Sequence, residues 1–319
     1  MITQINKGFR SIDQQIALLE ERGLIIEDKV QAKKELMQKN YFDLINGFET
    51  LLLVDSKADN KKYEDKYFGD FLSLYAFDRK LSSAMLTIIS DFEIRLKTSI
   101  AYHFCEAYCS KDEHTLNYTD ISNYYRNPAD TNYLALHLSS HELFKIDSKG
   151  RNFITRMKSK YKYVDRYDKP PFWVTIKVLT LHELLVIVYN LSRPVLKAVL
   201  NDFGLDLRHK EVFVNSIEII KLLRNHCAHF ELVNRFRTTG STRINSDLIK
   251  ELKLNCARRG YEIRLFDAVK VLNKYQAIDL VKDIIVTYWS ENISKGKEYI
   301  NLELIKRMGT NDITDWETI

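Results

Sequence analysis

One uninterrupted segment limits what this chain can fold into more than any other feature. After Gly69 no glycine or proline occurs until beyond Tyr108, and apolar residues recur at helical spacing throughout. Such a segment predicts one long helix, or two helices that meet at a kink. The whole chain has the same character, with only four prolines and ten glycines in 319 residues. We therefore expect an all-α protein.

Shorter helices are expected on both sides of this segment. Ser11 and Gln14 have the spacing of a capping box, and the helix that they begin ends at Gly23. Ser192 is the expected N-cap of another helix, because Arg-Pro follows it directly. Further helices are expected over residues 132–143, 151–161, 172–191 and 207–229.

The C-terminal third contains the one segment with a different period. Residues 259–266, RGYEIRLF, alternate between polar and apolar side chains, which predicts a short strand or hairpin. The following residues, 266–290, return to helical spacing.

The sequence contains no feature that directs it to a membrane or out of the cell. Its first residues, MITQINKGFRSIDQQ, lack the apolar core of a signal peptide. The most apolar segment, 172–191, contains Lys177, His182 and Glu183, which favours a buried helix over a membrane helix. Four cysteines without an export signal fit reduced thiols. We expect a cytoplasmic protein without a membrane partner.

Residues 222–231, LLRNHCAHFE, place a polar cluster directly after an apolar helical stripe. If the helix continues, Asn225 and His229 are at i, i+4 and share one face. Arg224 differs from His229 by five residues, or about 140° around the axis. The three side chains would then form one broad polar face that can line a groove, with His226 outside it.

This combination of side chains suits the cleavage of RNA. Arg224 is a permanently charged fork that matches phosphate, and His229 can transfer a proton near neutral pH. RNA carries its own nucleophile, the 2′-hydroxyl, so cleavage needs a base, an acid and a cation but no metal. Two copies related by a two-fold axis would supply two histidines and two arginines, which predicts a homodimeric site.

Other interpretations of the same residues remain open. An arginine and a histidine near a helix C-terminus often only satisfy terminal carbonyls and the helix dipole, and the pattern alone favours that structural role. His226, Cys227 and His229, with Cys256 downstream, match no standard zinc spacing. Phosphate-binding loops and common hydrolase motifs are absent. We therefore expect neither a metal nor another cofactor.

Basic residues gather around and after this cluster. Residues 224–274 have a net charge of +6, whereas the whole chain has +5. Such a local excess predicts a polyanionic partner, although a solvated basic face would look the same.

The sequence KLLRNHCAHFELVNR resembles the signature of the bacterial Abi-like family, the AbiD and AbiF type abortive-infection proteins. That signature is an Arg-Asn-x-x-Ala-His core followed by Asn-Arg. Here these positions are Arg224, Asn225, Ala228, His229, Asn234 and Arg235. The N-terminal segment that ends in NYFDLINGF and the segment beginning YAFDRKL are also similar to the family, in the family's order. The resemblance covers roughly residues 10–237.

This family is similar to the HEPN superfamily of all-α domains, whose Arg-x4-6-His motif forms a metal-independent ribonuclease site between two domains. The resemblance implies that Arg224 and His229 are catalytic and that Asn225 orients them. It also implies a role in defence against phage, in some relatives together with a structured RNA. Many relatives have a second histidine and an aromatic residue where this chain has Phe230 and Val233.

We thus expect N-terminal helices (1–66), a HEPN-like helical bundle (67–237) and a basic, mainly helical C-terminal extension (238–319). Three functions fit: a dimeric endoribonuclease in phage defence, a protein that holds a specific structured non-coding RNA without cutting it, or a protein-interaction module with a degenerate site. The residues predicted to contact RNA are Asn234, Arg235, Arg237, Arg243, Arg258 and Arg259.

Overall fold

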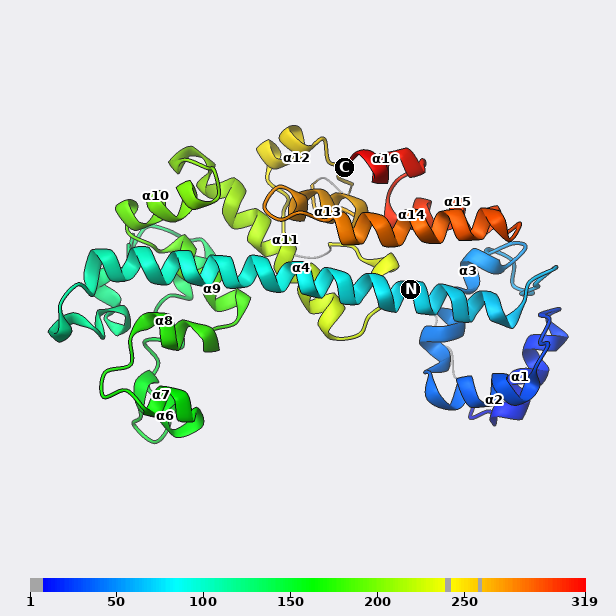
Figure 1. The fold of residues 1–319 in the computed structure, drawn as a ribbon, viewed down its shortest axis with the longest axis horizontal. Helices are drawn as coiled ribbons and strands as arrows, with labels where there is room; N and C mark the ends of the chain where they lie inside the picture. Colours follow the sequence, from blue (N-terminus) through cyan, green and yellow to red (C-terminus); the bar gives the residue numbers. More distant parts are fainter. Residues whose placement is uncertain (1–7, 239–241, 258–259) are drawn as a thin grey trace.

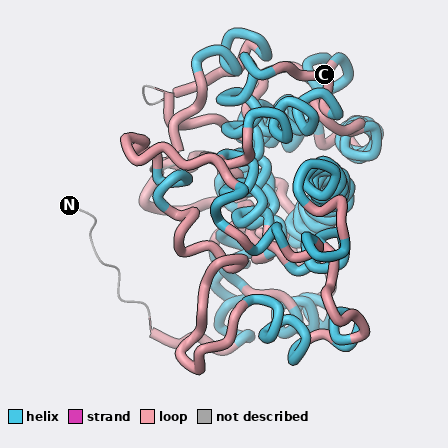
Figure 2. The backbone as a smooth tube through the Cα atoms, turned by 90° about the vertical axis from the view of Figure 1, so that its left-hand side faces the viewer, coloured by secondary structure: helices cyan, strands magenta, loops and turns pink. Residues whose placement is uncertain are grey.

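The computed structural model describes residues 8–238, 242–257 and 260–319, and within these ranges it contains helices and loops but no β-strand. The all-α prediction is therefore confirmed, and Figure 2, a view along the long axis, shows only helices and loops in the described chain. The first α-helices are α1 (Ile12–Glu21), α2 (Lys29–Gln38), α3 (Glu49–Leu52), α4 (Phe68–Tyr108), α5 (Tyr133–Leu136), α6 (Phe153–Lys160), α7 (Lys162–Asp165) and α8 (Phe172–Thr175).

The remaining α-helices are α9 (Leu181–Tyr189), α10 (Arg193–Asp202), α11 (Lys210–Ala228), α12 (Ser246–Leu252), α13 (Leu265–Asn273), α14 (Asp279–Ser294), α15 (Glu298–Met308) and α16 (Ile313–Thr318). Single turns of other helix types are the π-helix η1 (Phe42–Asn46) and the 3-10 helices η2 (Asp112–His114), η3 (Asn117–Thr119), η4 (Ile121–Asn123), η5 (Ile176–Val178), η6 (Leu207–His209) and η7 (Val233–Arg235).

Helix α4 is the axis of the molecule. It is one continuous helix of 41 residues, about 60 Å long at 1.5 Å per residue. Helices α8, α9, α10, α11 and α14 pack against it. Figure 1 shows α1 to α3 near one end of α4 and α6 to α8 near the other. The segment without glycine or proline thus forms the single helix of the two alternatives, and Glu93 pairs with Lys97 on its surface at 2.7 Å.

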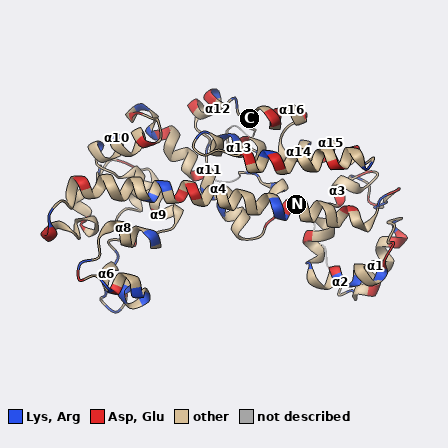
Figure 3. Cartoon of the chain, viewed as in Figure 1, with Lys and Arg blue, Asp and Glu red and all other residues tan. Residues whose placement is uncertain are grey.

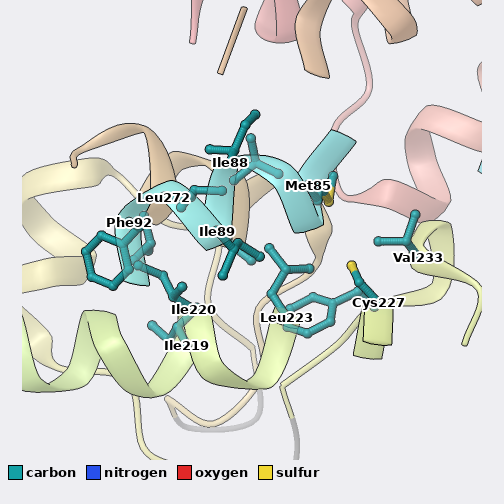
Figure 4. Close-up of a cluster of buried hydrophobic side chains, with 14 of the residues drawn as sticks. Met85, Ile88, Ile89, Phe92, Ile219, Ile220, Leu223, Cys227, Val233 and Leu272 are labelled. Atoms are coloured by element: carbon teal, nitrogen blue, oxygen red, sulfur yellow. The ribbon is translucent and has the colours of Figure 1, made fainter. Parts of the chain in front are cut away.

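Apart from α7, the described α-helices share one continuous hydrophobic core. Its central part lies between α4 and α11, where Figure 4 shows apolar side chains from both helices in contact with α13 and η7. The predicted stripe of α11 faces this core, and its members are Val212, Phe213, Ile217, Ile220 and Leu223. The core reaches from Ile16 to Trp316, so all three predicted regions contribute to it. Their boundaries after residues 66 and 237 stay a prediction.

The segment 172–191, predicted as one helix, is two. It divides into α8 with η5 and then α9, because Leu179 is extended (ψ 137°). Thr180 and Glu183 form a capping box that starts α9: the Thr180 N–H donates to Glu183 Oε2 at 2.6 Å. A new N-terminus is therefore more favourable here than continuation of the helix. None of the described helices has the length and apolar character needed to cross a membrane.

The strand or hairpin predicted at 259–266 does not form regular strands in the described residues. The described part of this segment forms only isolated antiparallel bridges, Arg237 with Arg264 and Ala257 with Glu262. The alternation that suggested a strand ends early because Leu265 is already the first residue of α13. Only Ile263 then points into the core as a strand residue would.

Two other helices differ from their expected lengths. The helix expected over 132–143 is limited to the four residues of α5. The helical segment 266–290 is divided into α13 and α14. The division falls where Tyr275 turns inward and its hydroxyl donates to Ser216 Oγ of α11 at 3.0 Å.

Two predicted helix starts are confirmed. Ser11 and Gln14 form the reciprocal capping box of α1. Ser192 occupies the N-cap position of α10, although its side chain makes no capping hydrogen bond.

Candidate functional site

The polar cluster lies at the C-terminal end of α11. Arg224 and Asn225 are exposed on the last turn of this helix, which ends at Ala228. His229 follows as the C-cap, and its N–H donates to the Asn225 carbonyl at 2.9 Å. The i, i+4 relation of Asn225 and His229 is therefore close to helical, as expected. All three predicted catalytic side chains are exposed at one helix end.

The side chains of Arg224, Asn225 and His229 are also free. Across the ranges that the structure describes, they have no hydrogen bond, ion pair or ring contact. A free arginine, amide and imidazole on one surface can meet a phosphate and a ribose without first breaking a protein contact.

The neighbours of these residues face the protein. The two ring nitrogens of His226 lie 2.9 Å from the Leu232 carbonyl and 2.9 Å from Glu231 Oε2. Cys227 is fully buried, and burial raises the pKa of its thiol to about 11. Both residues thus have structural roles. Within the described residues, no group of three or more His, Cys, Asp or Glu is placed to hold a metal ion.

The chain reverses direction directly after His229. Phe230 adopts the left-handed conformation (φ 62°). Its N–H donates to the Cys227 carbonyl at 3.2 Å, and the Glu231 N–H donates to the His226 carbonyl at 3.1 Å. This pair of bonds is a Schellman motif, in which glycine usually occupies the left-handed position. A phenylalanine there costs on the order of 1 kcal/mol, so its surroundings must hold it.

Arg79 of α4 holds the turn from outside. Its guanidinium carbon lies 4.9 Å from the centre of the Phe230 ring, and its Nη1 donates to the Phe230 carbonyl at 3.2 Å. The ring itself is 67% exposed. A cation–π contact at such a site contributes about 0.5–1 kcal/mol, which offsets much of the backbone strain.

Asp78, the preceding residue, holds the turn from inside. Its carboxylate is fully buried and accepts three hydrogen bonds: from the Val233 N–H at 3.0 Å, the Asn234 N–H at 2.8 Å and Asn234 Nδ2 at 2.6 Å. Burial raises the pKa of Asp78, although these bonds act in the opposite direction. The carboxylate thus ties the loop after the motif to α4.

Asn234 requires a correction. It is expected to contact RNA, but its side chain is fully buried. Its amide nitrogen donates to Asp78, and its amide oxygen accepts from Arg307 Nη1 of α15 at 3.2 Å. No polar atom of this side chain remains for a ligand, so Asn234 positions the loop.

The predicted RNA-contacting arginines are dispersed. Arg235 is half-buried, and its Nη2 donates to the Asn46 carbonyl of η1 at 2.8 Å. Arg237 is exposed and pairs with Glu262 at 3.1 Å. Arg243 is exposed at the other end of α11, in a cavity of about 700 Å³. Two further predicted contacts lie outside the described residues, and these are Arg258 and Arg259.

The loop that follows the motif, residues 230–235, contacts two segments that are distant in the sequence. They are the π-helix η1 with the adjoining Gly47, and the Asp78–Arg79 pair of α4. A Cβ on Gly47 would collide with Leu232 of the loop and with the Asp43 carbonyl, so only glycine allows this approach. Arg307 completes the assembly by donating to the Gly47 carbonyl at 3.0 Å.

The sequence patterns did not identify Asp78, Arg79 and Arg307 as part of this site. The first two lie in the segment YAFDRKL, where charged side chains are the usual solvent face of a helix. A signal was nevertheless present, because Asp78 follows Phe77 on the apolar side of the predicted helix. An acidic residue on that side needs a buried partner. Arg307 carries no comparable signal.

Comparison with known proteins gives one match. The model of a family described as "Abi-like protein" matches residues 34–233. The matched range includes η1, the whole of α4 and the motif. It ends at Val233, inside the loop that Asp78 ties to α4. Nothing among curated proteins or solved structures matches the chain.

Proposed function

The chain belongs to the Abi-like protein family, and from this premise we propose that it is a HEPN-like, metal-independent endoribonuclease that acts in phage defence. Membership of the family indicates abortive infection as the biological setting. The observation that carries the nuclease proposal is the contrast around the motif. Arg224, Asn225 and His229 are exposed and have no partner in the part of the chain that the structure describes, and they lie on a helix end that Asp78 and Arg79 fix in place.

Each of the three side chains has a role in the proposed reaction. His229 takes the proton of a ribose 2′-hydroxyl, whose oxygen attacks the adjacent phosphorus. The bond from phosphorus to the 5′-oxygen breaks, and a second imidazole protonates that oxygen. Arg224 stabilises the negative charge of the pentacoordinate phosphorane. Asn225 is a positioning residue one position from Arg224. The products are a 2′,3′-cyclic phosphate and a 5′-hydroxyl.

The need for two imidazoles supports a homodimer. Near this helix end one copy offers a single free histidine, because both ring nitrogens of His226 are engaged. A base and an acid on opposite sides of the phosphate therefore require a second His229. A two-fold axis beside the end of α11 would supply it together with a second Arg224.

The test is cleavage of a labelled single-stranded RNA by the purified full chain without added metal. His229→Ala and Arg224→Ala should each lower the rate at least ~100-fold, since general acid–base catalysis alone contributes ~10²–10⁴-fold. The matched controls are His137→Ala and Arg208→Ala, which remove an exposed histidine and an exposed arginine elsewhere.

Two outcomes would contradict the proposal. Equal cleavage by the wild type and both motif variants would show that Arg224 and His229 do not take part in the reaction. Copurification of an intact RNA of defined length, with no turnover and with loss of that RNA in Arg224→Ala, would instead identify a protein that holds RNA without cutting it.

A further inference from the structure

Residues 151–177 form a second strongly basic region of the molecule. They contain eight Lys and Arg against two Asp and Glu, the same excess as residues 224–274 in about half the length. Four of the basic residues belong to α6 and α7, and the other four lie directly before, between or after these helices and α8. Figure 1 shows α6 and α7 beyond α8, on the side away from α4, and Figure 3 shows Lys and Arg on this projection.

Four side chains of this region, two cations and two aromatic rings, contact one another in a row. Lys160 Nζ lies 5.1 Å from the centre of the Tyr161 ring, and the Tyr161 and Tyr163 rings are 5.6 Å apart. Lys177 Nζ from η5 lies 5.5 Å from the Tyr163 ring. Trp173 precedes Lys177 by four residues. We call these five residues the basic aromatic surface.

Two of the three rings of this surface are open to solvent, and the third, Tyr161, is half-buried. Trp173 is 60% exposed and Tyr163 is 38% exposed, and nearby Tyr167 is 43% exposed. A tryptophan is normally among the more buried side chains, so one that is largely in water is a candidate for contact with a partner.

The cations of this region are also free. Within the described chain, no acidic side chain pairs with five exposed basic residues, which are Lys160, Lys162, Arg166, Lys169 and Lys177. By contrast, Arg151 pairs with Asp147 and Arg156 pairs with Glu142. The unpaired cations thus lie within residues 160–177, the same segment that contains the exposed rings.

The exposure does not come from loose packing. Phe153 of α6 and Val164 of α7 are fully buried. Arg156 donates from Nη1 to the Lys145 carbonyl at 2.6 Å, and Lys158 Nζ donates to the Asp168 carbonyl at 2.9 Å. The projection is therefore a fixed platform whose rings are held outward.

A single strand of nucleic acid matches this chemistry. Its bases stack on exposed aromatic faces, and its phosphates meet the interleaved cations. A duplex would keep its bases inside. An anionic membrane is bound by a helix with a continuous exposed apolar face. The large exposed apolar side chains of residues 151–177 are Tyr163, Tyr167 and Trp173, and none of them belongs to α6, the longest helix of this region.

We propose that the basic aromatic surface is a second RNA site, which binds a single-stranded segment by stacking on Tyr163 and Trp173 while Lys160 and Lys177 contact phosphate. The proposal goes beyond the proposed nuclease function, since it requires neither Arg224 and His229 nor a second copy. A cutting protein would use it to retain the substrate strand, and a non-cutting protein to hold its RNA.

The test is fluorescence anisotropy with a labelled oligouridine of about 16 nucleotides, a length at the upper end of single-strand site sizes. The full chain carries His229→Ala so that the probe stays intact. Adding Tyr163→Ala with Trp173→Ala should weaken binding roughly tenfold or more, because each stacked base contributes ~1–3 kcal/mol. Adding Lys177→Ala instead should flatten the dependence of log Kd on log salt by about one phosphate contact.

The matched control removes two exposed rings at the opposite end of α4 by Phe9→Ala with Phe42→Ala, and it should bind like the parent. Unchanged affinity in the Tyr163 and Trp173 double variant would overturn the proposal. So would binding to phosphatidylserine vesicles that this variant loses while RNA binding is unchanged, because the surface would then be a membrane site. Normal cleavage by Arg224→Ala would end only the nuclease proposal, so the two failures are distinguishable.

Discussion

The two halves of the Abi-like signature lie in opposite environments. In the first half, Arg224, Asn225 and His229 are exposed at a helix end and have no partner among the described residues, whereas Asn234 is buried and Arg235 half-buried in hydrogen bonds with other segments. Only Phe230 and the three residues that follow it separate them. A sequence signature can thus combine exposed side chains, for which we propose a catalytic role, with buried residues that hold them in place. Substitutions in the first half should change chemistry, and substitutions in the second half should change stability.

The largest stability effect is expected at Asp78, which anchors the second half. Asp78→Ala removes the acceptor of three hydrogen bonds and leaves buried donors unpaired, so it should lower the free energy of unfolding by about 3 kcal/mol or more. Urea denaturation measures this. Asp91→Ala, at an exposed position of the same helix, is the control and should cost less than about 0.5 kcal/mol. Equal losses for both variants would show that the hydrogen bonds of Asp78 do not stabilise the fold.

Phe230, between the halves, should show a smaller effect that depends on the backbone. Phe230→Val places a β-branched residue in the left-handed conformation and removes the contact with Arg79, so a loss of about 2 kcal/mol is expected. Phe230→Gly relieves the strain and should stay within about 1 kcal/mol of the wild type. Thermal unfolding distinguishes them. If glycine costs as much as valine, the turn is not strained.

Cys227 allows a comparison within the first half, because it is buried between residues whose side chains are exposed. Its thiol has a pKa of about 11 in the fold against an ordinary value of about 9. The folded state thus favours the protonated thiol. Its contribution to stability is present below pH 9 and is lost as the pH rises toward 11.

Alkylation with iodoacetamide at pH 8, followed by mass spectrometry, reports the state of this thiol. Cys227 should react at least on the order of ten times more slowly in the folded protein than in urea. The partly exposed Cys256 provides an internal comparison. Rapid labelling of folded Cys227 would mean that the end of α11 opens.

The periodicity of apolar residues predicted those features of the fold and the site that depend on one helix alone. The helical character of residues 68–108, the buried stripe of α11 and the exposure of Arg224, Asn225 and His229 follow from apolar spacing along continuous segments. The same spacing left open whether residues 68–108 form one helix or two. Where two short signals compete, the prediction fails: the capping box at Thr180 divides a helix, and the first turn of α13 ends an apparent strand.

Contacts between distant segments could not be predicted in this way. The hydrogen bond from Val233 to Asp78 joins residues 155 positions apart, and no pattern in either segment indicates that the two are in contact. Asn234 therefore looked like a polar loop residue that is free to contact RNA. The basic aromatic surface was missed for a different reason. Lys and Tyr alternate at 160–163, but these residues are distant in the sequence from the motif, whereas the basic residues of 224–274 adjoin it.

The division of the signature is tested most directly by measuring RNA cleavage and thermal unfolding side by side in His229→Ala and Asn234→Ala. His229→Ala should keep the wild-type melting temperature and lose cleavage. Asn234→Ala should melt lower by several degrees, because it removes hydrogen bonds to Asp78 and Arg307. Its remaining cleavage should follow the folded fraction. A lowered melting temperature for His229→Ala, with cleavage that only follows the folded fraction, would contradict the account.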